Sequence, residues 1–237
     1  MFKKLYLKYL FLLDFLSFRR MSESDKRFSI LWRKRNVRLD DKTALTNFDS
    51  HYIYHPAWAA RVLAQTKPEE HIDISSTLHF STLVSAFIPT KFYDYRPAKI
   101  KLSNFESAVG DLNKLPFPDN SVPSLSCLHT IEHVGLGRYG DPLDPAGDLK
   151  AIKELKRVLA PQGNLLIVVP IGKPQIAFNA HRIYSYQQIV SYFSDLELKS
   201  FALIPDDGEE RGLIEEAAPT EVDKQNYGCG CFWFKKL

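Results

Sequence analysis

The stretch 109–170 limits the possible folds of this chain more than any other part of the sequence. After Asp111 and a proline-containing loop it holds an apolar run at 125–129, a helical pattern at 149–159 and an uninterrupted apolar run at 164–169. Uninterrupted apolar runs of this length are typical of central strands of parallel sheets, which are buried on both faces. A strand, a helix and a second strand in this order predict a parallel crossover unit.

The rest of the chain continues the alternation of strands and helices. We therefore predict a Rossmann-like α/β fold, with a seven-stranded, mostly parallel sheet and helices on both faces. Asp148 is expected to cap the helix that follows it, and 205–226 reads as a long acidic loop. The expected strands are 71–74, 91–95, 105–109, 125–129, 164–169, 196–204 and 227–235, and the expected helices are 55–64, 78–87, 149–159 and 186–193.

The first fifty residues differ in composition from the rest. Residues 1–20 read as a helix and 21–50 as a polar arm, so we expect an N-terminal segment 1–50 and an α/β domain 51–237. Residues 1–42 hold twelve Lys and Arg against five Asp and Glu, and because the whole chain carries +3, the remainder carries −4. A basic, aromatic helix of this kind fits peripheral contact with a membrane surface or another polyanion. A solvated helix face, or a helix docked on protein, is the alternative.

Composition excludes several classes of protein. The mild net charge gives no reason to expect a nucleic-acid partner. Asp14 interrupts the apolar N-terminal run, which is also too short and too charged to span a bilayer. Three cysteines do not make a disulfide framework, so we expect a cytoplasmic protein, with membrane association through 1–20 left open. Cys229 and Cys231 share one face of a predicted strand, and we expect no metal site.

Polar side chains follow four of the predicted strands where each strand ends. They are Asp73, Asp94, Asp111 and His129. Parallel strands bring their carboxyl ends to one edge of the sheet, where ligands of such folds bind. We therefore expect these four side chains around one crevice.

These acids resemble those of class I S-adenosylmethionine-dependent methyltransferases, in which an acid ends each of the first two strands and a third precedes a Leu-Pro-Phe-like loop. The resemblance implies that Asp73 orients the methionine end of the cofactor S-adenosylmethionine, directly or through water. It implies that Asp94 accepts hydrogen bonds from the ribose and that Asp111, beside Leu112, holds the adenine amino group. Carboxylates accept hydrogen bonds and suit such donors. The alternative for each Asp is a cap on the following turn.

The first loop departs from that family. Ser75, Thr77 and His79 stand where the family has three alternating glycines, which permit unusual dihedral angles and close approach to the ligand. We expect Ser75 and His129 among the cofactor-binding residues. Thr77 and His79 are expected to crowd the pocket unless the loop takes another path.

Two longer runs carry a narrower resemblance. They are Ile-Glu-His-Val-Gly-Leu-Gly-Arg-Tyr-Gly-Asp-Pro at 131–142 and Phe-Asn-Ala-His-Arg-Ile-Tyr at 178–184. Together they resemble an uncharacterised methyltransferase-like family, the domain of unknown function 268, over roughly 50–205. Both runs follow strands of the C-terminal half, so we expect both at the mouth of the crevice, where acceptor substrates lie in this fold.

Those runs also hold the candidate catalytic residues. His133 and His181 could take a proton from the acceptor, since a neutral imidazole suits a general base, and Glu132 could orient one of them. We expect the two imidazoles on one rim of the crevice. The alternative is a rigid loop scaffold, with the aspartates in turns and His181 bonded to a backbone carbonyl. The candidate substrate-binding residues are Tyr139, Asp141, Asp144, Asn179 and Arg182.

One motif points elsewhere. His129-Thr130-Ile131-Glu132-His133 has the spacing of the inverted zinc-peptidase motif, which needs both histidines on one face of a helix. Here a strand precedes the motif and Gly135 follows it closely, so the zinc hydrolase is a remote alternative.

The sequence thus predicts an S-adenosylmethionine-dependent methyltransferase that acts on a small-molecule or glycan acceptor. The glycine-free first loop keeps open a second interpretation, a non-catalytic methyltransferase-like binding or scaffold protein.

Overall fold

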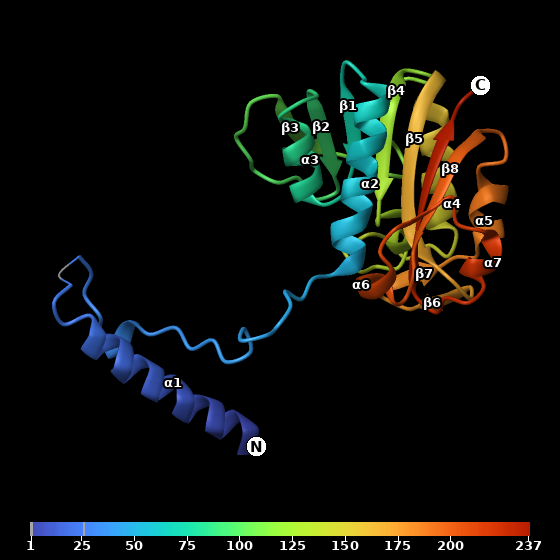
Figure 1. Ribbon diagram of the computed structural model, residues 1–237. Helices are drawn as coiled ribbons and strands as arrows, with labels where there is room; N and C mark the ends of the chain where they lie inside the picture. Colours follow the sequence, from blue (N-terminus) through green and yellow to red (C-terminus); the bar gives the residue numbers. More distant parts are fainter. Residues whose placement is uncertain (1, 26) are drawn as a thin grey trace. The chain divides into compact units, whose positions relative to one another are not determined.

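The computed structural model describes residues 2–25 and 27–237. The chain divides into two compact units, one ending at Asn47 and the other starting at Phe48 (Figure 1). Each unit is described by itself.

The N-terminal unit consists of α1 (Phe2–Met21), a short 3-10 helix η1 (Trp32–Lys34) and connecting chain. Phe11 and Phe15 pack against Trp32, with ring centroids 6.2 and 4.9 Å apart, and Lys42 pairs with Asp14. Most apolar side chains of α1 remain exposed. Among the helices of 2–25 and 27–237, none has the length and apolar character needed to cross a bilayer.

The second unit is built on one sheet, with the order β3-β2-β1-β4-β5-β10-β8-β9 (Figure 1). The first five of these strands run parallel, and β10 runs antiparallel to both of its neighbours. The predicted α/β fold is confirmed, with eight strands in the sheet because β9 adds a short edge strand. The strands are β1 (His71–Ile74), β2 (Thr90–Asp94), β3 (Phe105–Val109), β4 (Val122–Leu128), β5 (Leu159–Ile171), β8 (Glu197–Ile204), β9 (Ile214–Glu215) and β10 (Gly228–Lys235).

Helices cover both faces of the sheet. On one face, α2 (Ser50–Thr66) and α3 (Leu78–Val84) bury a cluster that includes Trp58. On the other face, α4 (Gly147–Val158) and α5 (Tyr186–Tyr192) cover the larger cluster, which includes Phe193. The central strand β5 is almost wholly buried from Leu165 onward, as its uninterrupted apolar run predicts.

Two helices differ from their predicted form. We expected α2 to begin near His55 with a proline in its first turn, but it begins at Ser50 behind the N-cap Asp49, and Pro56 lies inside it. The proline lacks the N–H that would donate to the carbonyl four residues earlier, and the helix continues past that missing bond. The predicted helix 78–87 ends at Val84; it buries Phe80 and leaves Leu83 exposed.

Several short elements lie where the sequence has no clear pattern. A two-stranded hairpin joins β6 (Gln175–Ala177) and β7 (His181–Ile183). The predicted loop 205–226 also contains α6 (Gly208–Arg211) and α7 (Pro219–Val222). These elements contain four residues or fewer, too few for a hydrophobic period to show.

Candidate active site

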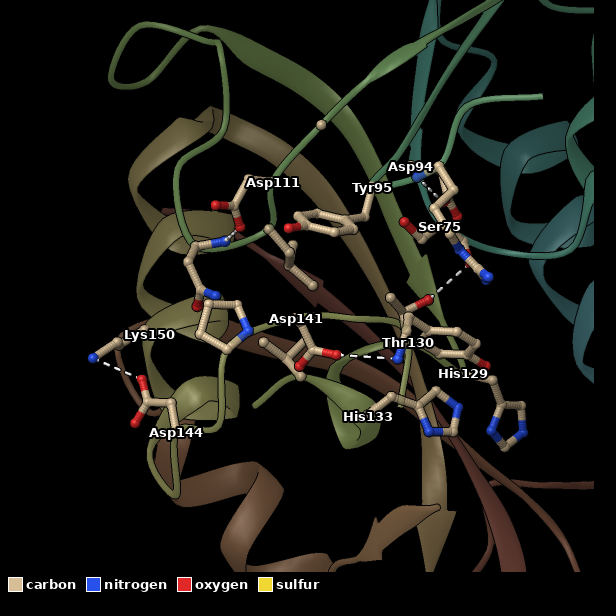
Figure 2. Close-up of a pocket in the computed structure, with 17 residues that line it drawn as sticks. Ser75, Asp94, Tyr95, Asp111, His129, Thr130, His133, Asp141, Asp144 and Lys150 are labelled. Atoms are coloured by element: carbon tan, nitrogen blue, oxygen red, sulfur yellow. Dashed lines mark hydrogen bonds and ion pairs between the residues drawn. The ribbon is translucent and has the colours of Figure 1, made fainter. Parts of the chain in front are cut away.

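A cavity of about 390 Å³ lies at the carboxyl ends of the parallel strands (Figure 2). Of the six predicted cofactor-binding residues, Ser75, Asp94, Asp111, Leu112 and His129 line it, and Asp73 does not. The complete lining is Ser75, Asp94, Tyr95, Arg96, Gly110, Asp111, Leu112, Asn113, His129, Thr130, His133, Val134, Tyr139, Asp141, Pro142, Asp144 and Lys150.

Asp94 and Asp111 stand at neighbouring strand ends, after β2 and β3. Asp94 Oδ1 accepts the backbone N–H of Arg96 at 2.6 Å, and Asp111 Oδ1 accepts that of Asn113 at 2.9 Å. Each bond fixes a turn and uses one of the two carboxylate oxygens. Both aspartates therefore cap a turn and also lie on the cavity wall.

The carboxylate of Asp73 points into the protein and does not line the cavity, so it makes no direct contact with this space. It is fully buried, and the hydroxyls of Ser126 and Ser76 donate to Asp73 Oδ1 at 2.6 and 2.5 Å. The Ser81 hydroxyl donates to Oδ2. Burial raises the pKa of Asp73 to about 6 despite these three donors. Asp73 thus ties the first loop to β4 and α3 and shapes the cavity indirectly.

His71 extends this buried network. Its Nε2 lies 2.9 Å from Ser126 Oγ and its Nδ1 lies 2.8 Å from Ser124 Oγ. Because Ser126 donates its only hydroxyl proton to Asp73, it accepts from His71, which fixes the proton of the neutral imidazole on Nε2. Burial lowers the pKa of His71 to about 3.

We predict that replacing His71 flattens the acid dependence of stability. In the folded protein the pKa of His71 is about 3, against an ordinary value of 6.5. Below pH 6.5 the unfolded chain therefore binds a proton that the folded chain does not bind. Asp73 opposes this between about pH 6 and 4, because its folded pKa is raised. On going from pH 7 to pH 5, the free energy of unfolding should fall by about 2 kcal/mol less in His71→Gln than in the wild type. Urea unfolding at pH 7 and at pH 5 measures this difference.

The control is His79→Gln, at an exposed position. Its stability should change with pH as that of the wild type does.

The first loop adopts a backbone conformation that glycine favours, although it contains no glycine. Ser75 has φ +55°, a left-handed conformation, and its N–H and hydroxyl both donate to the carbonyl of Tyr93, at 2.8 and 3.1 Å. Thr77 caps α3 by accepting the N–H of Phe80, and His79 is exposed and lines neither cavity. The expected crowding by His79 is therefore absent from the described structure, because α3 begins one residue before it.

A second cavity of about 530 Å³ adjoins the first. The two share Ser75, His129, His133 and Tyr139. The second cavity is lined by Tyr52, Ser75, Ser76, Thr77, Leu128, His129, Glu132, His133, Arg138, Tyr139, Asn179, Ala180, His181 and Tyr227. Both sequence runs that carry the narrower resemblance contribute to this wall, as expected for the crevice mouth.

His133 and His181 line this second cavity together. His133 Nδ1 lies 2.5 Å from the carbonyl oxygen of Ala180, which joins the two runs, and its side chain is 13% exposed. The ring of His181 packs against Tyr227 at 4.9 Å. Burial lowers the pKa of His181, so its imidazole is neutral at pH 7 and able to accept a proton.

Glu132 does not orient His133 or His181 by a hydrogen bond. It is 1% exposed, and its Oε1 lies 2.8 Å from His129 Nδ1 but 3.8 Å from His133 Nε2. The inverted zinc-peptidase arrangement is also not formed, because His129 precedes the single-turn 3-10 helix η2 (Ile131–His133) instead of sharing an α-helix with His133.

Arg182 is a structural clamp, so the prediction that it binds substrate is wrong. It is 4% exposed and donates to the carbonyl of Val134 at 2.7 Å and of Pro145 at 3.3 Å. Its Nε lies 3.5 Å from the carboxylate of Asp148. Asp148 itself was expected to cap α4, but the helix begins one residue earlier and Asp148 accepts the hydroxyl of Tyr184 at 2.9 Å.

Asp141 and Asp144 line the first cavity but also hold the loop before α4. Asp141 accepts the backbone N–H groups of Gly135 and Tyr139 at 2.7 and 3.2 Å. Asp144 accepts that of Ala146 at 3.0 Å and pairs with Lys150. Gly135 has φ +82°, and a Cβ there would lie 2.1 Å from the carbonyl oxygen of Asp144, so no other residue fits.

Several lining residues were not predicted from the sequence. Tyr52 enters the second cavity from α2 and Tyr227 from the residue before β10. The guanidinium of Arg96 lies 4.5 Å over the ring of Tyr139. Tyr52 was missed because the helix start was placed at His55. The pair His51 and His55, four residues apart, was the available signal for an earlier start.

Comparison with known proteins supports the family resemblance. Residues 119–210 match the family described as "Caenorhabditis protein of unknown function, DUF268". This segment contains both runs on which the resemblance was based. No curated protein matches the chain.

Solved structures with the same fold share little sequence with this chain. The N-methyltransferase NodS from Bradyrhizobium japonicum, in complex with S-adenosyl-L-homocysteine, is 11% identical over 76% of this chain and 85% of its own, with a TM-score of 0.54. The 1,6-didemethyltoxoflavin N1-methyltransferase of Burkholderia thailandensis, also bound to S-adenosylhomocysteine, is 9% identical over 77% of this chain and 78% of its own, at 0.53.

The fold by itself does not fix the reaction. The [4+2]-cyclase SpnF is 13% identical over 76% of this chain and 80% of its own, with a TM-score of 0.51. These likenesses establish the architecture alone. Residues 119–210 therefore match the DUF268 family, and the α/β fold of the second unit is shared with solved S-adenosylhomocysteine-bound methyltransferases.

Proposed function

We propose that this protein is an S-adenosylmethionine-dependent methyltransferase with a small-molecule or glycan acceptor. The observation that carries the proposal is the pair of adjoining cavities at the carboxyl edge of the sheet. The first has Asp94 and Asp111 on its wall, which suit the ribose hydroxyls and the adenine amino group, and Leu112 offers an apolar contact to the base. The second provides separate space for an acceptor.

The acceptor we propose is polar. Arg138, Asn179 and His181 line the second cavity beside the aromatic rings of Tyr52 and Tyr227, a mixture that suits sugar rings and hydroxylated small molecules. His133 borders both cavities, so we assign it and His181 as the candidate bases for the acceptor's proton. Transfer of radiolabelled methyl groups from S-adenosylmethionine to a panel of glycans and small hydroxylated or amino compounds tests this assignment.

Replacing Asp94 should weaken cofactor binding. Asp94→Ala removes an acceptor for the ribose hydroxyls and should cost about 1–3 kcal/mol, roughly a 5- to 150-fold rise in the Kd for S-adenosylhomocysteine. Asp94→Asn separates the two roles of the side chain, because it keeps an oxygen for the turn to Arg96. The control is Asp119→Ala, which removes an exposed acid from the opposite end of β4. Equal affinities in wild type and Asp94→Ala would refute the assignment.

A second candidate function is a non-catalytic binding protein. It is favoured by Asp73, whose buried carboxylate accepts serine hydroxyls and so cannot directly contact the methionine end of a cofactor. Binding of S-adenosylhomocysteine separates the two candidates, because a scaffold of this kind needs no cofactor affinity.

For the N-terminal unit we propose peripheral contact with anionic membrane surfaces. Exposed Phe2, Leu5 and Tyr9 stand beside Lys3, Lys4 and Lys8 on α1. Deleting 1–20 should reduce sedimentation with phosphatidylserine vesicles and leave the Tm nearly unchanged. Undiminished sedimentation would contradict the membrane proposal, and a large fall in the Tm would show that α1 stabilises the folded chain.

A further inference from the structure

Three potential metal ligands meet in a buried cluster beside the second cavity. His51 lies at the amino end of α2, His129 follows β4, and Cys229 lies at the start of β10; these ends gather at one edge of the sheet (Figure 1). One ligand atom from each residue lies within 4.8 Å of the others. Cys229 is fully buried, and His51 and His129 are each 9% exposed. The residues are far apart in the sequence, so the fold alone brings them together.

The orientation of His129 is that of a metal ligand. Its Nδ1 lies 2.8 Å from Glu132 Oε1, so Nδ1 carries the proton and Nε2 presents a lone pair. Metal-bound histidines commonly donate their other N–H to a carboxylate in this way. His129 Nε2 lies 3.3 Å from Cys229 Sγ. Tetrahedral zinc bonds of about 2.3 Å to sulfur and about 2.0 Å to nitrogen would place such a pair roughly 3.5 Å apart.

Two buried acceptor atoms next to His129 have no hydrogen-bond partner in the described part of the chain. Within the described residues, Glu132 Oε2 and His55 Nε2 are buried without any hydrogen-bond partner. His55 is fully buried, and its Nδ1 donates to the carbonyl of His51 at 2.6 Å, which leaves its Nε2 as a bare lone pair. Its ring packs against that of His129 with centroids 5.0 Å apart. Buried polar atoms without partners are rare and call for a bound ion or water.

We propose that His51, His129 and Cys229 bind a divalent transition metal ion of the zinc class, with Glu132 as the positioning residue of His129. Two imidazoles and a thiolate form a donor set that zinc accepts and that magnesium and calcium do not favour. His129 lines both cavities, which gives the ion a path of entry and leaves room for a water or His55 as fourth ligand. The proposed metal site does not rest on the proposed methyl transfer, because its ligands are argued from their own geometry.

The same residues also have the order of a Cys–His–Glu nucleophile relay. A nucleophilic thiol must meet its substrate, however, and Cys229 has no exposed surface. Metal binding requires only that a single ion enter.

Cobalt substitution tests the proposal in the full-length chain. After treatment with a chelator, titration with Co²⁺ should give one bound ion per chain and a thiolate-to-cobalt charge-transfer band in the near ultraviolet. Cys229→Ser should abolish the band. Cys231→Ser is the matched control, since Cys231 is equally buried two residues along the same strand, and it should keep the band. Absence of stoichiometric binding in folded wild-type protein, or a band that survives in Cys229→Ser, would overturn the proposal.

A second measurement keeps the test valid if Cys229→Ser does not fold. X-ray absorption of the zinc-loaded wild type should show one sulfur at about 2.3 Å and at least two nitrogens at about 2.0 Å. A first shell without sulfur would refute the site.

Discussion

Asp73→Ala should destabilise the protein by about 3–5 kcal/mol. The substitution removes the acceptor of three buried serine hydroxyls, from Ser76, Ser81 and Ser126, and leaves a small void between β1, β4 and α3. A buried donor that loses its partner costs its full desolvation penalty, and three are lost together. Denaturant unfolding at pH 7 measures the loss.

The size of this effect separates a structural carboxylate from a cofactor ligand. Asp73→Asn keeps one oxygen acceptor and should lose roughly half as much free energy, whereas exposed Asp119→Ala should change it by less than about 0.5 kcal/mol. If Asp73→Ala were as stable as the wild type and only bound cofactor more weakly, Asp73 would be a direct ligand after all.

Arg182→Met should also cost about 3–5 kcal/mol. Methionine keeps much of the side-chain volume but donates no hydrogen bond, so the carbonyls of Val134 and Pro145 lose a donor and Asp148 keeps an unpaired buried charge. The half-exposed Arg211→Met, whose ion pairs lie at the surface, is the control and should lose less than about 1 kcal/mol.

A second substitution isolates the charge. Adding Asp148→Asn to Arg182→Met should recover part of the lost stability, because it removes the unpaired carboxylate and keeps an acceptor for the Tyr184 hydroxyl. No recovery would show that the lost carbonyl contacts account for the whole effect. Wild-type stability in Arg182→Met itself would contradict the clamp.

The fold could be predicted because the sequence patterns of its strands and helices are long and occur several times along the chain. The run at 164–169 and the helix before it carry the parallel crossover by themselves, and the strand-end acids mark the edge where the cavities lie. The helix start was misplaced because Pro56 is a common first-turn residue, and the cap at Asp49 and the packing of His51 outweighed that preference. Short elements such as β9 depend on pairing with a distant strand, which no local pattern reveals.

The location of the candidate site could be predicted from the sequence, but the role of each side chain could be predicted less well. Asp94 and Asp111 line the cavity as expected, whereas Asp73, at the corresponding end of β1, turns inward. The sequence does not show which way a strand-end side chain points, because that depends on Ser126 and Ser81 in other elements. Arg182 was misassigned for the same reason, since the carbonyls that it binds belong to a loop some forty residues earlier.

Calorimetric titration of the full-length protein with S-adenosylmethionine and S-adenosylhomocysteine tests the central claim most directly. The methyltransferase account predicts saturable binding of both compounds at one site per chain, weakened in Asp94→Ala and unchanged in Asp119→Ala. Folded wild-type protein that binds neither compound at millimolar concentration would contradict the account and leave the binding-protein interpretation in its place.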